Sequence, residues 1–163
     1  MSEPGSKSSP TPEDGSKRLL NFFLYGMLRA SETLGTPAVF VRTVIEESLS
    51  KFLNQFPPFP HSEDATETCA AFTKAADQSG LFDGSDTLFR GDANTVSVEI
   101  GDRCPYRSMC TVRHDEGQPV HCIRTYVLAE MLRIRLKADF DWKLTRFGRP
   151  CHITLARSRW GQS

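Results

Sequence analysis

The spacing of apolar residues predicts that the first half of the chain is helical. Residues 17–34 are apolar over most of a helix circumference and are followed by Gly35, a residue type that commonly ends a helix. Thr36 and Pro37 then supply an N-cap and a proline at the first helical position. This start predicts a second helix, which has an apolar stripe and ends at "FPPFP" (56–60).

A third helix is predicted over residues 62–79, with Gly80 as its end. Cys69 lies on the apolar face of this helix and is interpreted as a small buried hydrophobic residue. After Gly80 the period of apolar residues changes to two, because Val96, Val98 and Ile100 alternate with polar residues. The turn signal "GDAN" precedes them, so a hairpin with an earlier strand around residues 88–90 is expected.

The last third of the chain predicts one more helix and a closing hairpin. Pro119 is well placed to begin a helix that runs to about Lys137 and carries two apolar faces, as a helix packed between two layers does. Strands around 140–144 and 151–155 alternate in period two across the turn "FGRP". The predicted fold class is α+β, with N-terminal helices on a small, mainly antiparallel sheet, a buried C-terminal helix and a closing β-hairpin.

The chain of 163 residues fits one domain. Residues 1–16 are polar and rich in Pro and Ser, which predicts a disordered tail before a single domain over 17–158. This N-terminus has no apolar segment of the kind that a secretory signal needs, and the run from Leu19 to Leu28 is too short to span a bilayer. We therefore expect a cytoplasmic protein without a membrane span, in which cysteines stay reduced.

The formal net charge of zero hides an asymmetry. Residues 1–100 carry 8 basic and 14 acidic side chains, whereas residues 101–163 carry 12 and 6, a net charge of +6. Such a field suits anionic ligands or thiolates, although complementary charge on two layers of one domain is an equal explanation. Direct DNA binding is not expected, because no helix-turn-helix is visible and these arginines are spread over several elements.

Four of the five cysteines fall in this basic region. Cys104 and Cys110 lie in the segment "RCPYRSMC", which is expected to be a loop at the sheet edge, Cys122 in the first turn of the buried helix, and Cys151 on the inward face of the last strand. Ligands need only converge at about 2.3 Å from a metal, so long intervals between them are no obstacle. The sequence predicts a shared zinc site of four thiolates, with an iron–sulfur cluster as second choice. The alternative is two incidental loop thiols and two core residues.

Two histidines could replace a cysteine. His121 is a fifth candidate ligand, although it directly precedes Cys122 and its side chain would point about 100° away on a helix. His114 is the other. A cysteine-nucleophile enzyme would need a thiol paired with a histidine, for instance Cys110 with His152. Nothing in the sequence fixes that pairing, so a binding role is favoured over an enzyme.

The aromatic residues leave room for a ligand cavity. The N-terminal elements hold more aromatic surface than three short helices need, from Phe22, Phe23, Tyr25, Phe40, Phe52, Phe82 and Phe89. A Phe-rich core is the simpler explanation. Arg124 and Arg135 lie within about 20° of each other on the predicted fourth helix and could bind an anionic head group, or could cover the core with their aliphatic stems.

The order of these elements resembles the 4-vinyl reductase (4VR) domain. The resemblance covers about residues 18–157 and rests on "LGTPAVF", "SGLF", "PVHCIRTYVLAEML" and "FGRPCHITL". Its most telling parts are Cys122 and the ending carried by Gly148, Cys151 and Ile153. The family also has a cysteine on the penultimate strand, where this chain reads "WKLTRFG", so Cys104 and Cys110 would have to supply the missing ligand.

The resemblance implies a small-molecule-binding or sensor domain of the kind found in regulators and "hydrocarbon-binding" proteins, with a fold shared by subunits of transport-particle (TRAPP) complexes. A hydrophobic cavity between the helices and the sheet is implied as well. The sequence itself also predicts a homodimer, because the first helix is apolar over more of its surface than one small sheet can cover.

Overall fold

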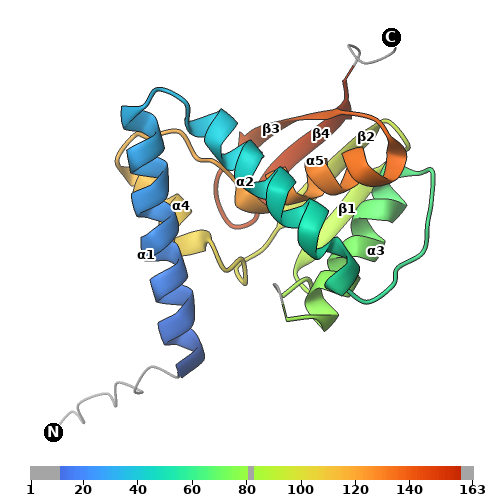
Figure 1. The fold of residues 1–163 in the computed structure, drawn as a ribbon, viewed down its shortest axis with the longest axis horizontal. Helices are drawn as coiled ribbons and strands as arrows, with labels where there is room; N and C mark the ends of the chain where they lie inside the picture. The colour runs from blue at the N-terminus through green and yellow to red at the C-terminus, as the bar shows by residue number, and fades with distance from the viewer. Residues whose placement is uncertain (1–11, 81–82, 159–163) are drawn as a thin grey trace, which may run out of the picture.

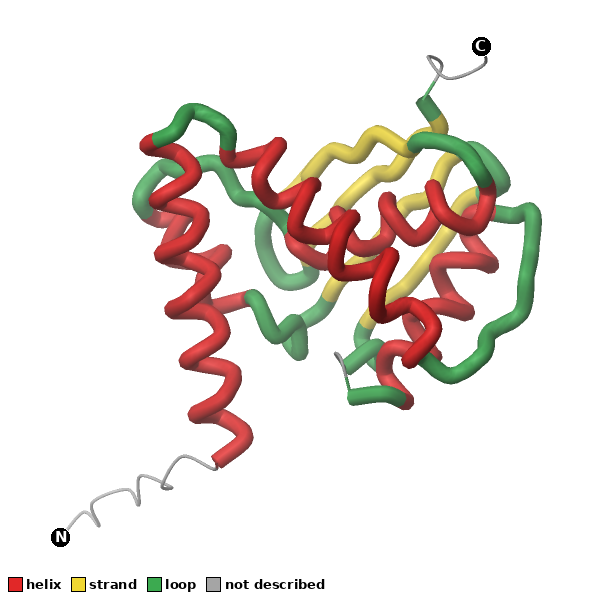
Figure 2. The backbone as a smooth tube through the Cα atoms, viewed as in Figure 1, coloured by secondary structure: helices red, strands yellow, loops and turns green. Residues whose placement is uncertain are grey.

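The computed structural model describes residues 12–80 and 83–158. These residues form an α+β fold in which N-terminal helices are followed by a four-stranded antiparallel sheet and a closing hairpin, as predicted (Figures 1 and 2). The helices are α1 (Pro12–Thr33), α2 (Pro37–Phe52), the 3₁₀ turn η1 (Leu53–Gln55), α3 (Ala65–Gln78), α4 (Arg107–Asp115) and α5 (Ile123–Leu136). The strands are β1 (Thr87–Gly91), β2 (Thr95–Ile100), β3 (Phe140–Arg146) and β4 (Cys151–Arg157).

The sheet has the strand order β1-β2-β4-β3, and all its pairs are antiparallel. The register places Val98 opposite Ile153 and Val96 opposite Leu155, so the buried residues of β2 and β4 share one face. Helices α3 and α5 pack on that face, and α2 lies over α5 (Figure 1). Helix α5 therefore lies between two layers, which is the reason for its two apolar faces.

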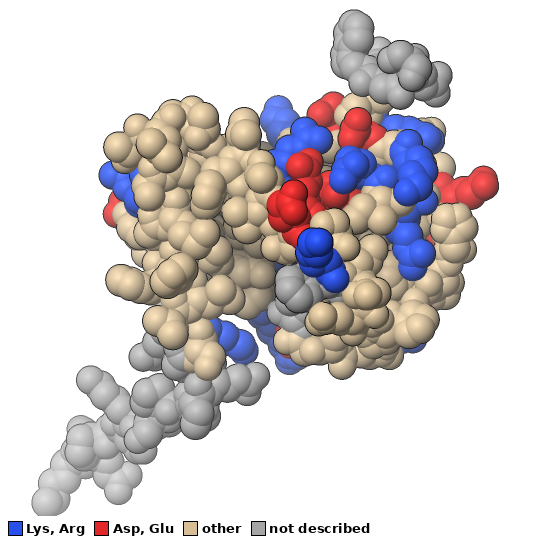
Figure 3. Space-filling model, in the orientation of Figure 1, with Lys and Arg blue, Asp and Glu red and all other residues tan. Residues whose placement is uncertain are grey.

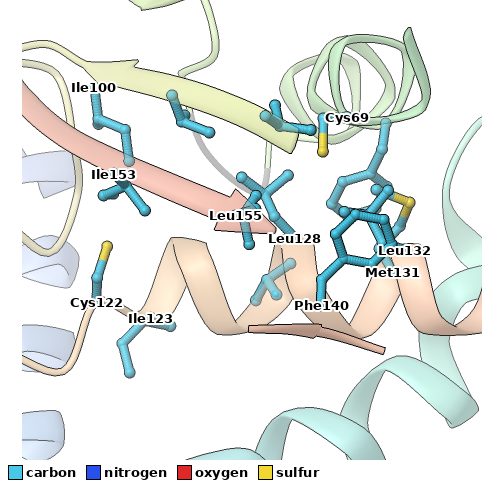
Figure 4. Packing of buried hydrophobic residues seen from close by; sticks show 14 of the residues in the cluster. Cys69, Ile100, Cys122, Ile123, Leu128, Met131, Leu132, Phe140, Ile153 and Leu155 are labelled. Atoms are coloured by element: carbon cyan, nitrogen blue, oxygen red, sulfur yellow. The ribbon is translucent and has the colours of Figure 1, made fainter. Parts of the chain in front are cut away.

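Helices α1 and α4 stand at one side of this layered body, with α4 behind α1 in the view of Figure 1. The core itself lies between α3, α5 and the sheet, where Phe72, Met131 and Leu132 are inaccessible to solvent. Figure 4 shows Cys69 of α3 among these apolar side chains, and its exposed fraction is 0%. The prediction that Cys69 is a small buried hydrophobic residue is confirmed.

The helix ends follow the predicted turn chemistry with small shifts. Gly35 and Gly80 lie two residues after the ends of α1 and α3 and have positive φ, +72° and +74°, where a residue with a Cβ would be strained. Pro37 is the first residue of α2, as predicted, but the N-cap Thr36 makes no side-chain capping bond. Helix α1 begins at Pro12, earlier than predicted, and the predicted disordered tail otherwise lies outside the described residues.

Two predictions about the cysteine-bearing region were wrong. The segment after Cys104 is not a loop throughout, because residues 107–115 form α4 and Cys110 lies within it. Met109, Cys110 and Arg113 form the buried face of this helix, and that face is too short to give a clear apolar period in the sequence. Pro119 does not begin a helix either: α5 starts at Ile123, with Cys122 as its N-cap residue.

Within residues 12–80 and 83–158, no helix combines the length and the apolar character needed to cross a bilayer.

Candidate functional site

The four predicted cysteine ligands line one small cavity. Its volume is about 20 Å³, enough for one water-sized body, and its walls are otherwise mostly apolar. Besides Cys104, Cys110, Cys122 and Cys151, it is lined by Ile100, Arg107, Val120, Leu144 and Phe147. The four thiols thus converge from parts of the sequence that are up to 47 residues apart, counted from Cys104 to Cys151.

Each thiol is placed by a different element. Cys104 follows β2, Cys110 lies in α4, Cys122 precedes the first residue of α5, and Cys151 is the first residue of β4. Figure 4 shows the Cys122 sulfur pointing from the start of α5 toward β4. Cys110 and Cys122 are buried, and Cys104 and Cys151 are partly buried, so the cavity lies just below the surface.

The thiols share the cavity without forming a compact ligand group. Among the residues that the structure describes, no three His, Cys, Asp or Glu side chains lie close enough together to hold a metal ion. A bound ion would need the sulfur atoms to approach to about 2.3 Å from a common centre. Side-chain rotation or a small movement of one of the four segments would have to bring them there.

Burial controls the ionisation of these thiols. It raises the pKa of Cys104, Cys110 and Cys122, and the pKa of Cys110 is raised further by the neighbouring Cys122, Cys104 and Cys151. Arg124 and Arg107 oppose the effect of burial at Cys104. At neutral pH these three thiols are therefore protonated, and a cation entering the cavity would displace protons.

Arg107 connects the walls of the cavity. Its Nη1 atom donates to the carbonyl oxygen of Gly148 at 2.6 Å and to Cys151 Sγ at 3.0 Å, and its Nη2 atom donates to the carbonyl oxygen of Gly101 at 2.6 Å. The guanidinium thus joins α4 to the end of β2 and to the turn between β3 and β4. It also places the positively charged guanidinium directly against the Cys151 sulfur.

Polar side chains of α1 hold the segment that carries Cys104 and Cys110. Asn21 is buried, donates from Nδ2 to the carbonyl oxygen of Pro105 at 2.7 Å, and accepts from the Met109 backbone N–H at 3.1 Å. Glu32 pairs with the fully buried Arg113 of α4. The Arg113 hydrogen bond is the main reason why the pKa of Glu32 is lowered.

The histidines considered as ligands or bases lie outside the cavity lining. His121 is partly buried with Nδ1 3.5 Å from the Tyr126 hydroxyl, and burial lowers its pKa. His114 is exposed on α4 and stacks on Phe147 with ring centroids 4.5 Å apart. His152 follows Cys151 on β4, so its side chain points to the opposite face of the sheet from the cavity, away from Cys110.

A second, larger cavity of about 570 Å³ lies between α2, α5 and the end of α3. Ile45, Leu49, Phe56 and Val127 give it apolar walls. Arg124, which is buried and donates to Thr87 Oγ1 at 2.6 Å, contributes a positive charge. This combination suits a small apolar molecule with an anionic group.

The two predicted head-group arginines have different surroundings. Arg124 lines the larger cavity, whereas Arg135 does not, because its guanidinium lies over the Phe59 ring at 4.2 Å from the centroid. Most of the aromatic residues expected around a cavity are elsewhere too. Phe22 and Phe23 point outward from α1. Among the described residues that line the larger cavity, Phe56 is the one phenylalanine. The side chain of Phe52 and all of Phe82 lie outside the described part.

The two cavities share two segments of chain. Cys104 and Arg107 line the thiol cavity while Tyr106, between them, lines the larger one. Likewise Cys122 lines the thiol cavity and the next residues of α5 line the larger one. Burial raises the pKa of Tyr106 to about 12, and the neighbouring Cys104 adds to that shift.

Comparison with family models, curated proteins and solved structures finds no match to this chain.

Proposed function

We propose that this protein is a small-molecule-binding or sensor domain whose cysteines 104, 110, 122 and 151 bind one metal ion, with zinc as the preferred ion. The observation that supports it is the convergence of four thiols from four elements on one ion-sized cavity. Four of the five cysteines of the chain line this one cavity, whereas the fifth, Cys69, lies elsewhere in the core. The resemblance to the 4VR domain agrees with this reading, with Cys104 and Cys110 supplying the ligand that β3 lacks.

Zinc suits this cavity better than an iron–sulfur cluster. Four thiolates in tetrahedral geometry are a common structural zinc site, and one ion needs only about the space of one water molecule. A cluster of several iron and sulfide ions would need a much larger cavity than the 20 Å³ described here. A redox protein that uses an iron–sulfur cluster or reactive thiols is the alternative, and the guanidinium of Arg107 beside Cys151 is the contact that supports the version with reactive thiols.

The ion would join three parts of the chain: the segment 104–110, the start of α5 and the start of β4. Its binding free energy would add to the stability of the folded state. The larger cavity would take an apolar ligand with its anionic group near Arg124. Tyr106 of the larger cavity lies between Cys104 and Arg107 of the thiol cavity, so a ligand would be sensed next to the metal site.

Metal binding is tested by titrating the reduced, metal-free chain with zinc and measuring the number of bound ions per chain by native mass spectrometry. We expect one zinc per chain, loss of binding in Cys151→Ser, and unchanged stoichiometry in the control Cys69→Ser. A colourless protein agrees with zinc, whereas a brown protein with visible absorption that bleaches on reduction indicates an iron–sulfur cluster. Absence of stoichiometric metal in the parent chain would contradict the proposal.

The ligand cavity is tested separately with 1-anilinonaphthalene-8-sulfonate, a fluorescent probe with an apolar body and an anionic group. Arg124→Met should weaken its binding by about tenfold, as expected for loss of a buried charged hydrogen bond. The matched control is Arg135→Met, on the same helix but outside the cavity lining. Equal affinity in both variants would remove Arg124 from the ligand site.

We also propose that the protein is a homodimer and works in a reducing compartment such as the cytoplasm. The described surface supports self-association, because several large apolar side chains of α1 are exposed. Free cysteines agree with reducing surroundings.

A further inference from the structure

The outward face of α1 carries a stripe of uncharged residues. Leu19, Phe22 and Phe23 are 65%, 74% and 64% exposed, and Gly26, Ala30 and Thr33 continue the line as exposed small residues. At 100° per residue all six fall within about 100° of the helix circumference. The view in Figure 3 shows the side of the molecule formed by α1 with far fewer charges than the side formed by α2 and α5.

The opposite face of α1 is already used. Asn21, Leu28 and Ser31 are buried, and Asn21 and Glu32 bind the segment of α4. The outward stripe therefore has no role in holding α1 to its own chain. Its large apolar residues are exposed to a degree that is unusual for a surface without a partner.

The stripe is ordered by size along the helix. Its N-terminal half is large, with Leu19, Phe22 and Phe23, and its C-terminal half is small, with Ala30 and Thr33. Gly26 lies between the two halves, and no atom lies within 4 Å of where its Cβ would be. Glycine destabilises a helix interior relative to alanine, and nothing in its own chain requires it here.

We propose that α1 pairs with α1 of a second copy of this chain, antiparallel and crossing at Gly26. A two-fold axis at that position brings the large half of one stripe against the small half of the other, with Phe22 at the height of the partner's Ala30. The glycine then allows the two backbones to approach closely at the crossing. A parallel pair would instead place large residues on large ones and leave the small halves apart.

The area agrees with a specific contact. Two phenylalanines per copy, each about two-thirds exposed, would remove roughly 400 Å² of aromatic surface from water in the pair. Leu19, Leu20 and Leu34, which are exposed next to them, extend the buried area toward the about 1,000 Å² of a specific interface. This inference rests on the proposed homodimer and names its surface and its direction.

The test is a size swap across the proposed axis, with the dimer dissociation constant measured by sedimentation equilibrium on the full chain. Phe22→Ala and Ala30→Phe should each weaken the dimer by about tenfold or more, the first by losing contact and the second by overpacking. The double variant Phe22→Ala/Ala30→Phe should recover most of the affinity, because each large residue again meets a small one. Both positions are exposed, and circular dichroism would verify that the fold is kept.

Two further variants complete the test. Gly26→Leu should weaken the dimer without lowering the helix content, since its side chain meets nothing in its own chain. Leu88→Ala, which changes an exposed apolar residue on β1, should alter the dimer by no more than about twofold. A monomer at all concentrations would overturn both the homodimer and this inference. If the dimer dissociation constant is unchanged by the substitutions at Phe22, Ala30 and Gly26, or does not recover in the double variant, the antiparallel α1 pair alone is overturned.

Discussion

Two halves of the candidate metal site are held in different ways. Cys122 and Cys151 lie at the start of α5 and β4, elements fixed by the close-packed core between the helices and the sheet. Cys104 and Cys110 lie on a segment that reaches the same core through Met109 and Cys110, and that is joined to α1 by the directional polar contacts of Asn21 and Glu32. The first pair is the fixed half of the site, and we expect the second pair to be the half that adjusts to an ion.

This difference explains how four thiols can share a cavity and still be too far apart to hold a metal ion. Apolar packing resists displacement in every direction, because any shift opens a void. The segment with Cys104 and Cys110 depends in addition on hydrogen bonds from α1, which can adjust their geometry with less loss of contact area than apolar packing. We therefore expect metal binding to act mainly on residues 103–116, and the following changes test that view.

The largest effect is expected from losing a ligand of the fixed half. Cys122→Ser should abolish stoichiometric zinc binding, and with it most of the stabilisation by the ion, which for structural zinc sites is on the order of 10 kcal/mol. The measurement is urea unfolding with and without zinc. The control Cys69→Ser should lose only about 1–3 kcal/mol, through a buried hydroxyl, and should keep its response to zinc. If both variants respond to zinc alike, Cys122 is not a ligand.

The next effect is a dependence of stability on pH. Burial raises the pKa of Cys104, Cys110 and Cys122 above the value of about 8.5 expected in the unfolded chain. Their contribution to stability is complete below that pH and is lost as the pH rises, by up to about 1.4 kcal/mol per pH unit for each thiol. Metal-free protein should therefore become less stable from about pH 8.5 upward.

Zinc should remove most of this alkaline loss, because the bound thiolates are already deprotonated in the folded state. Cys69, whose pKa burial raises to about 12, would keep its own part of the slope in both cases. Unfolding curves measured over the alkaline range with chelator and with zinc would show the difference. Equal slopes would mean that the thiols of the cavity do not bind the ion.

A smaller effect is expected at the contact between α1 and α4. Glu32→Gln leaves the fully buried Arg113 without a charged partner and should cost about 3 kcal/mol. The matched control is Glu46→Gln, which removes an exposed pair with Arg42 and should cost only about 0.3–0.5 kcal/mol. Both are measured by urea unfolding, and similar costs would show that the link between α1 and α4 is unimportant for stability.

The smallest change tests the adjustable half directly. Asn21→Ala removes two hydrogen bonds to the segment with Cys104 and Cys110, at a cost of about 2 kcal/mol in stability. Hydrogen exchange of residues 103–116 should become faster without zinc, and zinc should restore protection. The control Asn54→Ala changes an exposed asparagine in η1. If exchange in the segment is unaffected by Asn21→Ala, something other than α1 holds it.

Periodicity predicted the strands, three of the helices and the closing hairpin well, because each has a clear apolar face. It missed α4, whose buried face consists of Met109, Cys110 and Arg113, a mixture without a recognisable hydrophobic pattern. The sequence also placed the start of α5 too early. Proline is common at the first position of a helix, but Pro119 lies in the connection before α5.

The sequence predicted that the four cysteines meet at a metal site. The structure places all four on one cavity, but among the described residues no three of them lie close enough to hold an ion, so the metal site stays a prediction. Asn21 was not foreseen as part of the site, and Arg107 was expected only as one of several positive charges near the cysteines. Gly148, which Arg107 binds, lies 41 residues away in the sequence, and Met109, which Asn21 binds, lies 88 residues away, so neither contact has a local signal. Hydrogen bonds between distant segments are set by the packed fold and not by a pattern along the chain.

The most direct test of the metal site is X-ray absorption spectroscopy at the zinc edge on the zinc-loaded chain. We expect four sulfur atoms coordinated to the zinc at about 2.3 Å and no nitrogen or oxygen ligand. A shell with a nitrogen ligand would bring His121 or His114 into the site in place of one cysteine. A shell of mainly nitrogen and oxygen atoms would show that the thiol cavity does not hold the ion, and would contradict the account.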